Sequence, residues 1–378
     1  MPDHLNPSRS DRILWALAEV TAANGFNAVN TQSVAVVAGA SETTVRERFP
    51  HTRDYVLGLW EFTGRHAFKK LVEGVALSIL NEDFTRLQEL LLQLGQENTD
   101  HFCLRQLLLM CASDEELHRL VRAEILAFVT HDDEVIVTQR LVALVMAMGC
   151  VTTTVDVSTL PVRTGPLAEF QYAVTHPSPP TTLPPDEADF MELQDIVSKD
   201  VTTSAILNAA MHLIADKGYR VATMKEIRTL ANVTDDEIFS RYQTKLDILI
   251  DIVERRLREA RTEYWKFREE LGGRVGARLA EAVMWRGHFA PRRRPACCFY
   301  LEKDFVALNE PRLAARIRAA LSLFMVDHLA ELGGAERDAA PDHITTGIAL
   351  ADGLVIAAVL YPEAARLPFD IITMSMLD

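Results

Sequence analysis

Residues 12–57 read RILWALAEVTAANGFNAVNTQSVAVVAGASETTVRERFPHTRDYVL, and residues 205–250 read AILNAAMHLIADKGYRVATMKEIRTLANVTDDEIFSRYQTKLDILI. The two stretches align over 46 positions without a gap, and eight of the aligned pairs are identical. Similar residues occupy many other pairs, including Phe26/Tyr219 and Ser41/Thr234. The second copy begins 193 residues after the first, a period of about one domain. The chain therefore contains two copies of a domain and is not a solenoid, whose repeats recur about every 20–50 residues.

The first copy carries the signals for three short helices. Its opening residues Ile13, Ala16, Leu17 and Val20 are apolar at helical spacing. Gly25 ends this helix, and Asn30 and Ser41 are side chains of the kind that cap helix N-termini. The predicted elements are helices over 31–38 and 42–48 with a turn at Gly39, and a longer helix from about Thr52.

The second copy repeats these signals. It predicts a helix over 200–216 followed by Gly218, a cap at Thr223, a turn at Ala231-Asn232 and a cap at Thr234. Three short helices with this turn spacing are typical of a helix-turn-helix domain. The last of the three is the recognition helix, which enters the major groove of DNA. The sequence therefore predicts two helix-turn-helix heads, a first head over 8–60 and a second head over 198–253.

The segments after the heads are predicted to be helical bodies, over 61–158 and 254–378, because apolar residues recur in them at helical spacing. Prolines crowd the stretch between the halves, so a semi-rigid linker is expected over 159–197, with an extended run over 176–185. Strand patterns are scarce, and the Val- and Thr-rich segment Cys150–Val157 is the main exception. The expected fold class is all-α.

Over residues 9–70 and 200–270 the chain resembles the TetR family of bacterial transcriptional regulators. Members usually have one head per chain and act as homodimers, so the resemblance implies two TetR-like protomers joined in one chain as an intramolecular pseudo-dimer. In the family, the last two helices of each protomer form a four-helix interface. The segments Val137–Met148 and Ile344–Leu360 occupy that place, with Gly149 and Gly353 in comparable surroundings.

The resemblance also implies the partners and the contact residues. The partners are a double-stranded DNA operator and a small-molecule effector, bound by a chain that is monomeric in solution. The expected DNA contacts are Asn30, Gln32, Ser41, Thr43, Thr44, Arg46 and Arg48 in the first head and Thr223, Lys225, Thr234, Ser240, Arg241 and Lys245 in the second. Arg46 replaces the family's usual Tyr and can contact a phosphate or a guanine. The family's phosphate-binding Lys is retained as Lys245 but is Thr52 in the first head.

The second recognition helix begins with three acids, Asp235, Asp236 and Glu237, which would bring negative charge towards phosphates. Thr234 and Glu237 also form a capping box, and acids at a helix N-terminus suit its dipole. This helix is therefore expected to read few or no bases, and the operator to be asymmetric. An alternative stays open, in which the protein is a degenerate TetR-like sensor or protein-interaction module with little or no DNA binding.

The resemblance implies a cytoplasmic, effector-responsive repressor, and the composition is compatible with that class. The net charge is −14, yet 8–57 and 201–250 each sum to zero, so the excess acid lies outside the heads. Five cysteines without a CxxC pair argue against a disulfide framework, and neither a signal peptide nor a membrane span is expected. The known nucleotide-binding and hydrolase motifs are absent, as is paired His spacing, so no enzyme, cofactor or metal site is expected. The basic cluster Pro291–Pro295 is predicted to be a solvated loop.

Overall fold

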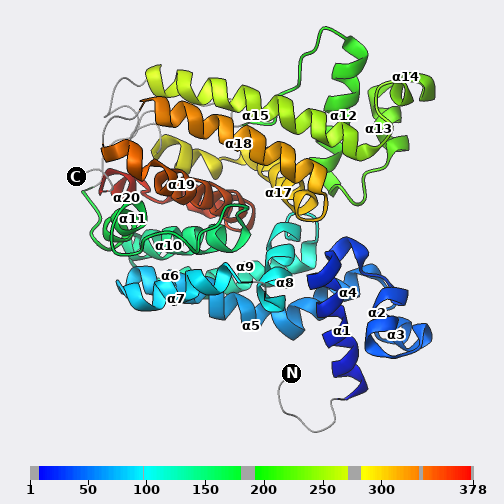
Figure 1. Cartoon of the computed structure of the whole chain (residues 1–378), viewed down its shortest axis with the longest axis horizontal. Helices are drawn as coiled ribbons and strands as arrows, with labels where there is room; N and C mark the ends of the chain where they lie inside the picture. Colours follow the sequence, from blue (N-terminus) through cyan, green and yellow to red (C-terminus); the bar gives the residue numbers. More distant parts are fainter. Residues whose placement is uncertain (1–7, 97, 180–191, 271–281, 332–334, 376–378) are drawn as a thin grey trace.

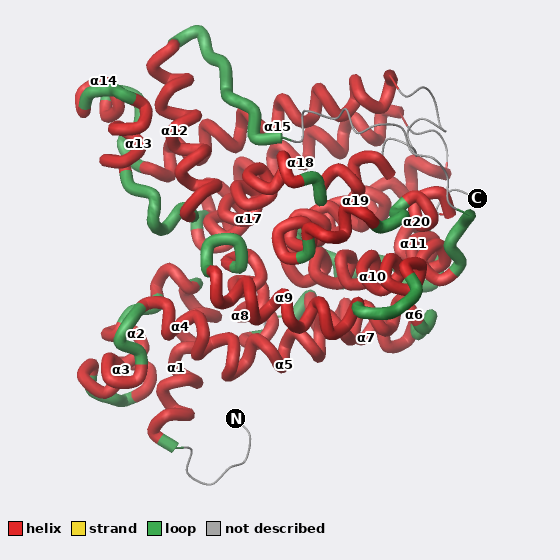
Figure 2. The backbone as a smooth tube through the Cα atoms, turned by 180° about the vertical axis from the view of Figure 1, so that it is seen from behind, coloured by secondary structure: helices red, strands yellow, loops and turns green. Residues whose placement is uncertain are grey.

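The computed structural model describes residues 8–96, 98–179, 192–270, 282–331 and 335–375. Across these ranges the regular structure is helical and includes no β-strand, which confirms the all-α prediction (Figure 2). The segment Cys150–Val157, the one rival for a strand, is the end of a helix followed by a loop. Both heads lie at the same end of the molecule, on the right in Figure 1, and the bodies fill the other end.

The first half contains eleven labelled helices. Its head comprises α1 (Arg9–Asn24), α2 (Thr31–Ala38) and α3 (Glu42–Arg48). A long helix follows, made of α4 (Thr52–Leu59), α5 (Arg65–Ala67) and α6 (Gly74–Leu80), joined by π-helical segments at Trp60–Gly64 and Phe68–Glu73. The body continues with α7 (Phe84–Leu94), α8 (Thr99–Met110), α9 (Glu115–Val129), α10 (Glu134–Thr152) and α11 (Pro166–Thr175).

The second half follows the same order. Its head comprises α12 (Val201–Lys217), α13 (Met224–Ala231) and α14 (Asp235–Phe239). Its body contains α15 (Lys245–Glu270), a helix over 282–288, α17 (Arg294–Asn309), α18 (Pro311–Glu331), α19 (Ala335–Leu360) and α20 (Asp370–Ser375).

The two heads agree in backbone conformation at their turns. Gly39 after α2 has φ 61° and ψ 37°, and its counterpart Asn232 after α13 has φ 55° and ψ 47°. Both are left-handed conformations, which glycine adopts freely and asparagine tolerates better than most residues. The predicted caps at Asn30 and Thr223 are confirmed, since their side chains accept hydrogen bonds from the backbone N–H three residues later. Local signals therefore predicted both helix-turn-helix segments in register.

The predicted linker contains a helix that the sequence analysis missed. Within 159–197, α11 runs from Pro166 to Thr175 and buries Leu167, Phe170 and Val174. Gly165, with φ 72°, and a proline at the first helical turn start this helix. It packs against α19 and α20, so this part of the chain belongs to the body. Of the extended run expected over 176–185, residues 180–185 lie outside the described residues.

The two halves meet where α10 crosses α19, the most extensively packed pair of helices. An ideal Cβ atom placed on Gly149 would lie 1.6 Å from the carbonyl oxygen of Ala349. One placed on Gly353 would lie 1.9 Å from the carbonyl oxygen of Val145. The backbones are therefore in contact at this crossing, and only glycine allows such an approach. The two glycines have the comparable surroundings that the sequence predicted.

A cluster of charged side chains lies beside this crossing. The guanidinium of Arg105, on α8, donates to the carbonyl oxygens of Thr152 (3.1 Å) and Thr153 (2.6 Å) at the end of α10. On α17, Lys303 Nζ lies 2.8 Å from the Asp304 carboxylate. Burial, and then the negative charge of Asp304, raise the pKa of the Asp352 carboxyl on α19 to about 7. Charged side chains of α8, α17 and α19 therefore come close together beside the end of α10, and the charge of each affects the protonation of Asp352.

Two helices are long and apolar enough to cross a membrane by length and composition, among the described residues. They are Glu134–Thr152 and Pro341–Leu360, and 78% and 61% of their apolar windows are buried inside the structure. They belong to α10 and α19, which pack against each other. Their apolar side chains thus pack mainly against each other and the rest of the core between the two halves.

The basic cluster Pro291–Pro295 is not the solvated loop that the sequence predicted. Arg293 is fully buried, with 0% of its surface exposed. Arg294 donates to the carbonyl oxygen of Val359 at 2.8 Å, and Arg292 Nε lies 3.0 Å from the Glu192 carboxylate. The prediction was wrong because the cluster begins α17 and helps to hold the C-terminal end of α19, a tertiary role that charge density alone does not reveal.

Candidate nucleic-acid interface

The first head presents its recognition helix, α3, with two exposed arginines. Arg46 and Arg48 both lie on the surface, and the Arg48 guanidinium carbon is 5.3 Å from the centre of the Phe49 ring. Gln32 and Thr43 are exposed as well. In the described part of the chain, no hydrogen bond or ion pair engages the side chains of Gln32, Thr43 or Arg46. These donors are therefore available to a ligand.

Three other predicted contacts of the first head serve mainly to cap its helices. The Asn30 side chain accepts from the Ser33 N–H at 2.9 Å, and the Ser41 hydroxyl accepts from the Thr44 N–H at 3.2 Å. Thr44 also receives a hydrogen bond from the Arg9 guanidinium, which ties α1 to α3. These hydrogen bonds help to fix the position of the recognition helix.

The second head presents three acids in the first turn of its recognition helix, where the first head has Glu42, Thr43 and Thr44. Asp235, Asp236 and Glu237 are all exposed in the first turn of α14. The predicted capping box is confirmed: Thr234 N–H donates to the Glu237 carboxylate at 2.8 Å, and the Glu237 N–H donates to the Thr234 hydroxyl at 3.2 Å. The backbone hydrogen bond from Thr234 lowers the pKa of Glu237, so this face is negative at neutral pH.

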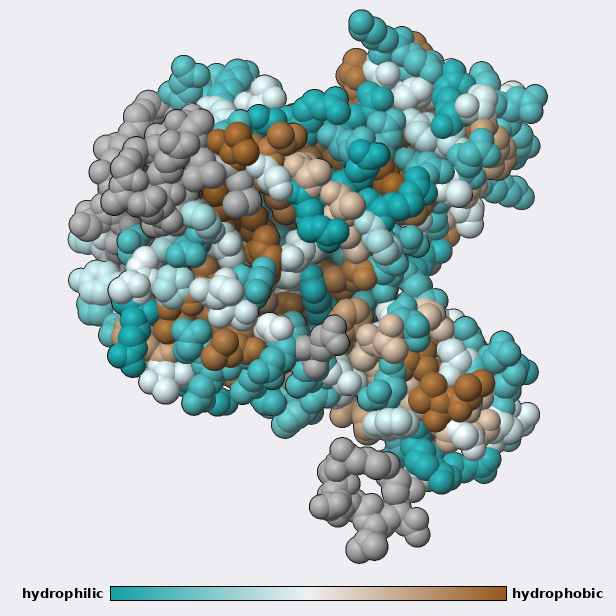
Figure 3. Space-filling model, viewed as in Figure 1, coloured by the Kyte–Doolittle hydropathy of each residue, from teal (hydrophilic) through white to brown (hydrophobic). Residues whose placement is uncertain are grey.

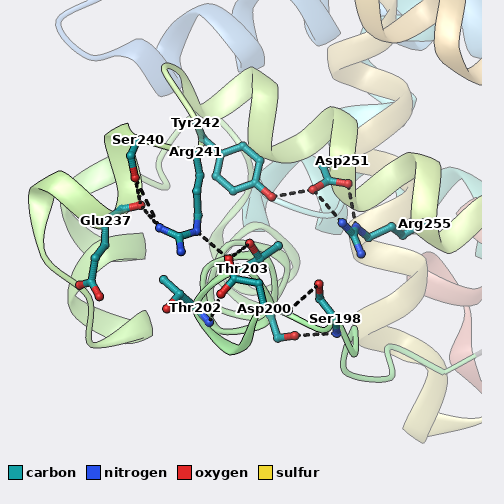
Figure 4. A network of polar contacts seen from close by, with 11 residues as sticks. Ser198, Asp200, Thr202, Thr203, Glu237, Ser240, Arg241, Tyr242, Asp251 and Arg255 are labelled. Atoms are coloured by element: carbon teal, nitrogen blue, oxygen red, sulfur yellow. Dashed lines mark hydrogen bonds and ion pairs between the residues drawn. The ribbon is translucent and has the colours of Figure 1, made fainter.

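Most cations of the second head are engaged inside the head. Figure 4 shows the contacts of Arg241. Arg241 donates to the Asp200 carboxylate at 2.8 Å and to the Glu237 carbonyl oxygen at 2.9 Å. Its hydrogen bond lowers the pKa of Asp200 to about 2, and the pair is ionised at neutral pH. Arg228 pairs with Asp235 at 2.6 Å.

Three other predicted contacts of the second head remain on its surface. Thr223 caps α13, and the Ser240 hydroxyl donates to the Glu237 carbonyl oxygen at 3.1 Å. Lys225 is exposed, and within the described residues no hydrogen bond or ion pair engages its ammonium group. Lys225 is thus a cation on α13 that the second head leaves available.

Lys245 does not point outwards, contrary to the predicted role as a phosphate ligand. Its ammonium donates to the carbonyl oxygens of Tyr219 and, at 2.6 Å, of Ala222. It also lies 4.1 Å from the centre of the Tyr219 ring. Burial lowers its pKa. The carbonyl groups of the turn after α12 compete for this lysine, and the sequence spacing gave no sign of that competition.

We expect Lys245→Met to destabilise the second head rather than to weaken a phosphate contact. Two carbonyl oxygens would lose a charged donor, which costs about 1–3 kcal/mol of unfolding free energy. Thermal or urea unfolding followed by circular dichroism measures this effect. Lys225→Met is the matched control, because that exposed lysine should change stability by less than about 0.5 kcal/mol. Equal stability of the two variants would contradict the structural role.

The two heads therefore have similar backbone conformations but differ in the charges on their surfaces. The sequence showed the three acids, but the ion pairs of Arg228 and Arg241 required the folded arrangement of α12, α13 and α14. Among the described residues, no group of three or more His, Cys, Asp or Glu side chains could hold a metal ion. The feature best suited to a macromolecular ligand is the arginine-bearing surface of the first head.

Comparison with known families gives an independent result for the second head. Residues 206–252 match the model of the bacterial regulatory proteins of the tetR family, a range that runs from α12 into α15. No match was found among curated proteins. The matched range contains the three-helix geometry described above. The match shows that the second head is similar to the helix-turn-helix domain of bacterial regulatory proteins of the tetR family, over 47 of the 378 residues of the chain.

Proposed function

We propose that the protein is a cytoplasmic, non-enzymatic transcriptional repressor that binds an asymmetric operator with two unequal heads. The observation that carries this proposal is the contrast between exposed Arg46 and Arg48 on α3 and the exposed acids of α14. Arginine can bind guanine edges or phosphates, whereas carboxylates repel phosphates. The first head then reads most of the bases, and the second head reads few bases and contacts the DNA backbone through few groups, among them Lys225.

The proposed architecture is a pseudo-dimer within one chain. The reciprocal crossing at Gly149 and Gly353 supports it, as does the packing of α11 against α20 beside that crossing. Each half then has a head and a body, with domain limits near those proposed from the sequence. The exception is the linker, which is shortened by α11. A chain that supplies both halves is monomeric when it binds DNA.

The proposed effector is a small molecule that binds in one or both bodies. The first helix of each head packs on a body helix of its own half, α1 on α8 and α12 on α17. A ligand that displaced α8 or α17 would move the attached head. Because half-sites are read about one helical turn apart, a small change in head position would weaken operator binding.

Selection of bound sequences from random duplex DNA, at low and moderate salt, tests the proposal. Enrichment of an asymmetric motif supports two unequal heads. A palindrome would mean that two chains join through their first heads. Absence of enrichment at both salt concentrations would contradict the proposed function as a repressor.

Arg46→Ala is expected to weaken binding to the selected operator by about ten- to a hundredfold, through loss of about 1–3 kcal/mol at a base contact. Fluorescence anisotropy with labelled duplex measures the change. Arg86→Ala, on the exposed surface of α7, removes the same charge far from the head and should leave affinity nearly unchanged. Equal effects of the two substitutions would show that Arg46 acts only through net charge.

A second candidate function is a sensor or protein-interaction module that has lost productive DNA binding. The paired cations of the second head favour it, since Arg228, Arg241 and Lys245 are all engaged internally. The exposed arginines of the first head oppose it. Failure of the selection experiment together with normal folding would favour this candidate.

A further inference from the structure

The turns that end the first helix of each head contact the opposite half of the molecule. These turns are Gly25-Phe26 after α1 and Gly218-Tyr219 after α12, and they occupy equivalent positions of the repeat. Gly25 has φ 74° and ψ 161°, and Gly218 has φ 85° and ψ 153°. The same backbone conformation thus presents both turns to the other half.

The first turn fits against the end of α17. An ideal Cβ on Gly25 would lie 1.5 Å from Asn309 Oδ1, so the amide occupies the space above the glycine. Asn309 Nδ2 donates to the Phe305 carbonyl oxygen at 3.1 Å and lies 3.5 Å from Gln106 Oε1 on α8. The amide is therefore held in place from both halves.

The second turn fits against the end of α8 and the side of α17. An ideal Cβ on Gly218 would lie 2.9 Å from Ser113 Cβ and 3.1 Å from Glu302 Oε1. The Tyr219 N–H donates to Glu302 Oε2 at 2.8 Å, and Glu302 is only 2% exposed. A buried carboxylate thus anchors this turn between the two bodies.

The two heads also touch each other directly. The Arg220 guanidinium carbon of the second head lies 4.9 Å from the centre of the Phe26 ring of the first head. This distance is typical of a cation–π contact. The equivalent residue of the first head is Asn27, which cannot make a reciprocal contact of this kind. One arginine therefore bridges the heads from one side.

Between the turns, α8 and α17 pack against each other, as Figures 1 and 2 show from opposite sides. We call the set Gly25, Phe26, Gly218, Tyr219, Arg220, Glu302 and Asn309 the clasp. The heads are joined twice, through their own bodies and through the clasp. In Figure 3 the heads project as separate lobes on the right, with a gap between them.

We propose that the clasp fixes the separation of the two recognition helices, and that Arg220 is a positioning residue that determines which half-site spacing the protein accepts. This inference rests on the proposed function for its DNA consequence, but the clasp itself is a property of the free protein. Adding one base pair between half-sites shifts and rotates the second site about the DNA axis. Heads held at a fixed separation cannot follow that change.

The first arm of the test measures the separation of the heads without DNA. Val36→Cys and Thr229→Cys place spin labels at equivalent exposed positions of α2 and α13, and the five native cysteines are buried. Pulsed electron–electron double resonance should give one narrow distribution of distances between the two spin labels in the otherwise unchanged protein. Arg220→Ala should broaden or shift it, and Arg220→Lys should restore part of the narrow component. Arg258→Ala, an exposed arginine on α15, is the control.

The second arm uses operator duplexes with one or two base pairs added to or removed from the spacer. The unchanged protein should bind the selected spacing at least about tenfold more tightly than the others. Arg220→Ala should reduce that preference while it retains affinity for the isolated first half-site. An unchanged distance distribution in Arg220→Ala would overturn the proposal that the clasp fixes the separation of the heads. Absence of DNA binding with a broadened distribution would instead refute the proposed function alone.

Discussion

Gly149→Ala is expected to lower the free energy of unfolding by about 3 kcal/mol or more, the upper end of what overpacking costs. The added methyl group would overlap the carbonyl oxygen of Ala349, with 1.6 Å between their centres. A side chain could rotate away from such a clash, but the obstacle is backbone. Helices α10 and α19 would have to separate along the contact that joins the halves. Urea denaturation followed by circular dichroism at 222 nm measures the loss.

Gly347 provides the matched control in the same structure. It lies on α19, two turns before Gly353, and an ideal Cβ there meets no atom within 4 Å. Gly347→Ala should leave stability unchanged or raise it by about 0.5–1 kcal/mol, because alanine favours a helix more than glycine does. Similar unfolding midpoints for Gly149→Ala and Gly347→Ala would show that the halves do not depend on the backbone contact.

Asp352→Asn is expected to stabilise the protein at pH 8 and to change its stability much less at pH 5. Burial raises the pKa of this carboxyl from 3.8 to about 7. Between these values the folded protein holds a proton that the unfolded chain has released, so the Asp352 contribution to stability falls as pH rises. Above about pH 7 the folded state carries the full cost of ionising Asp352 in its half-buried site, which amounts to a few kcal/mol.

Unfolding free energies measured from pH 5 to pH 8 test this prediction. The difference between Asp352→Asn and the unchanged protein should grow with pH through the neutral range. Asp132→Asn, at an exposed position before α10, removes a carboxylate without burial and should give a nearly constant difference. A pH-independent difference for Asp352→Asn would mean that Lys303 and Arg105 fully compensate the buried carboxylate.

Local signals in the sequence were sufficient to predict the helices of the heads, but not all the helices of the bodies. Asn30, Ser41, Thr223 and Thr234 each accept a hydrogen bond from the N–H three residues later, so their capping roles were visible in short stretches of sequence. Helix α11 was missed because its prolines suggested a linker, and its apolar face becomes meaningful only against α19 and α20.

The candidate site shows the same limit. The sequence correctly gave the exposed arginines of α3 and the acids of α14, since both follow from position within a short helix. It placed Lys245 on phosphate because the nearest competitors, two carbonyl oxygens, lie more than twenty residues earlier in the chain. Side-chain partners of that kind are chosen by folding, and a pattern of residue types does not specify them.

The reciprocal crossing of Gly149 and Gly353 also affects how binding depends on protein dose. In a homodimer, equivalent glycines belong to separate molecules, and the active species disappears on dilution as the square of concentration. Here both glycines belong to one polypeptide, so their contact forms at a high effective concentration that dilution does not alter. If the protein binds an operator as proposed, operator occupancy should then follow the first power of protein concentration.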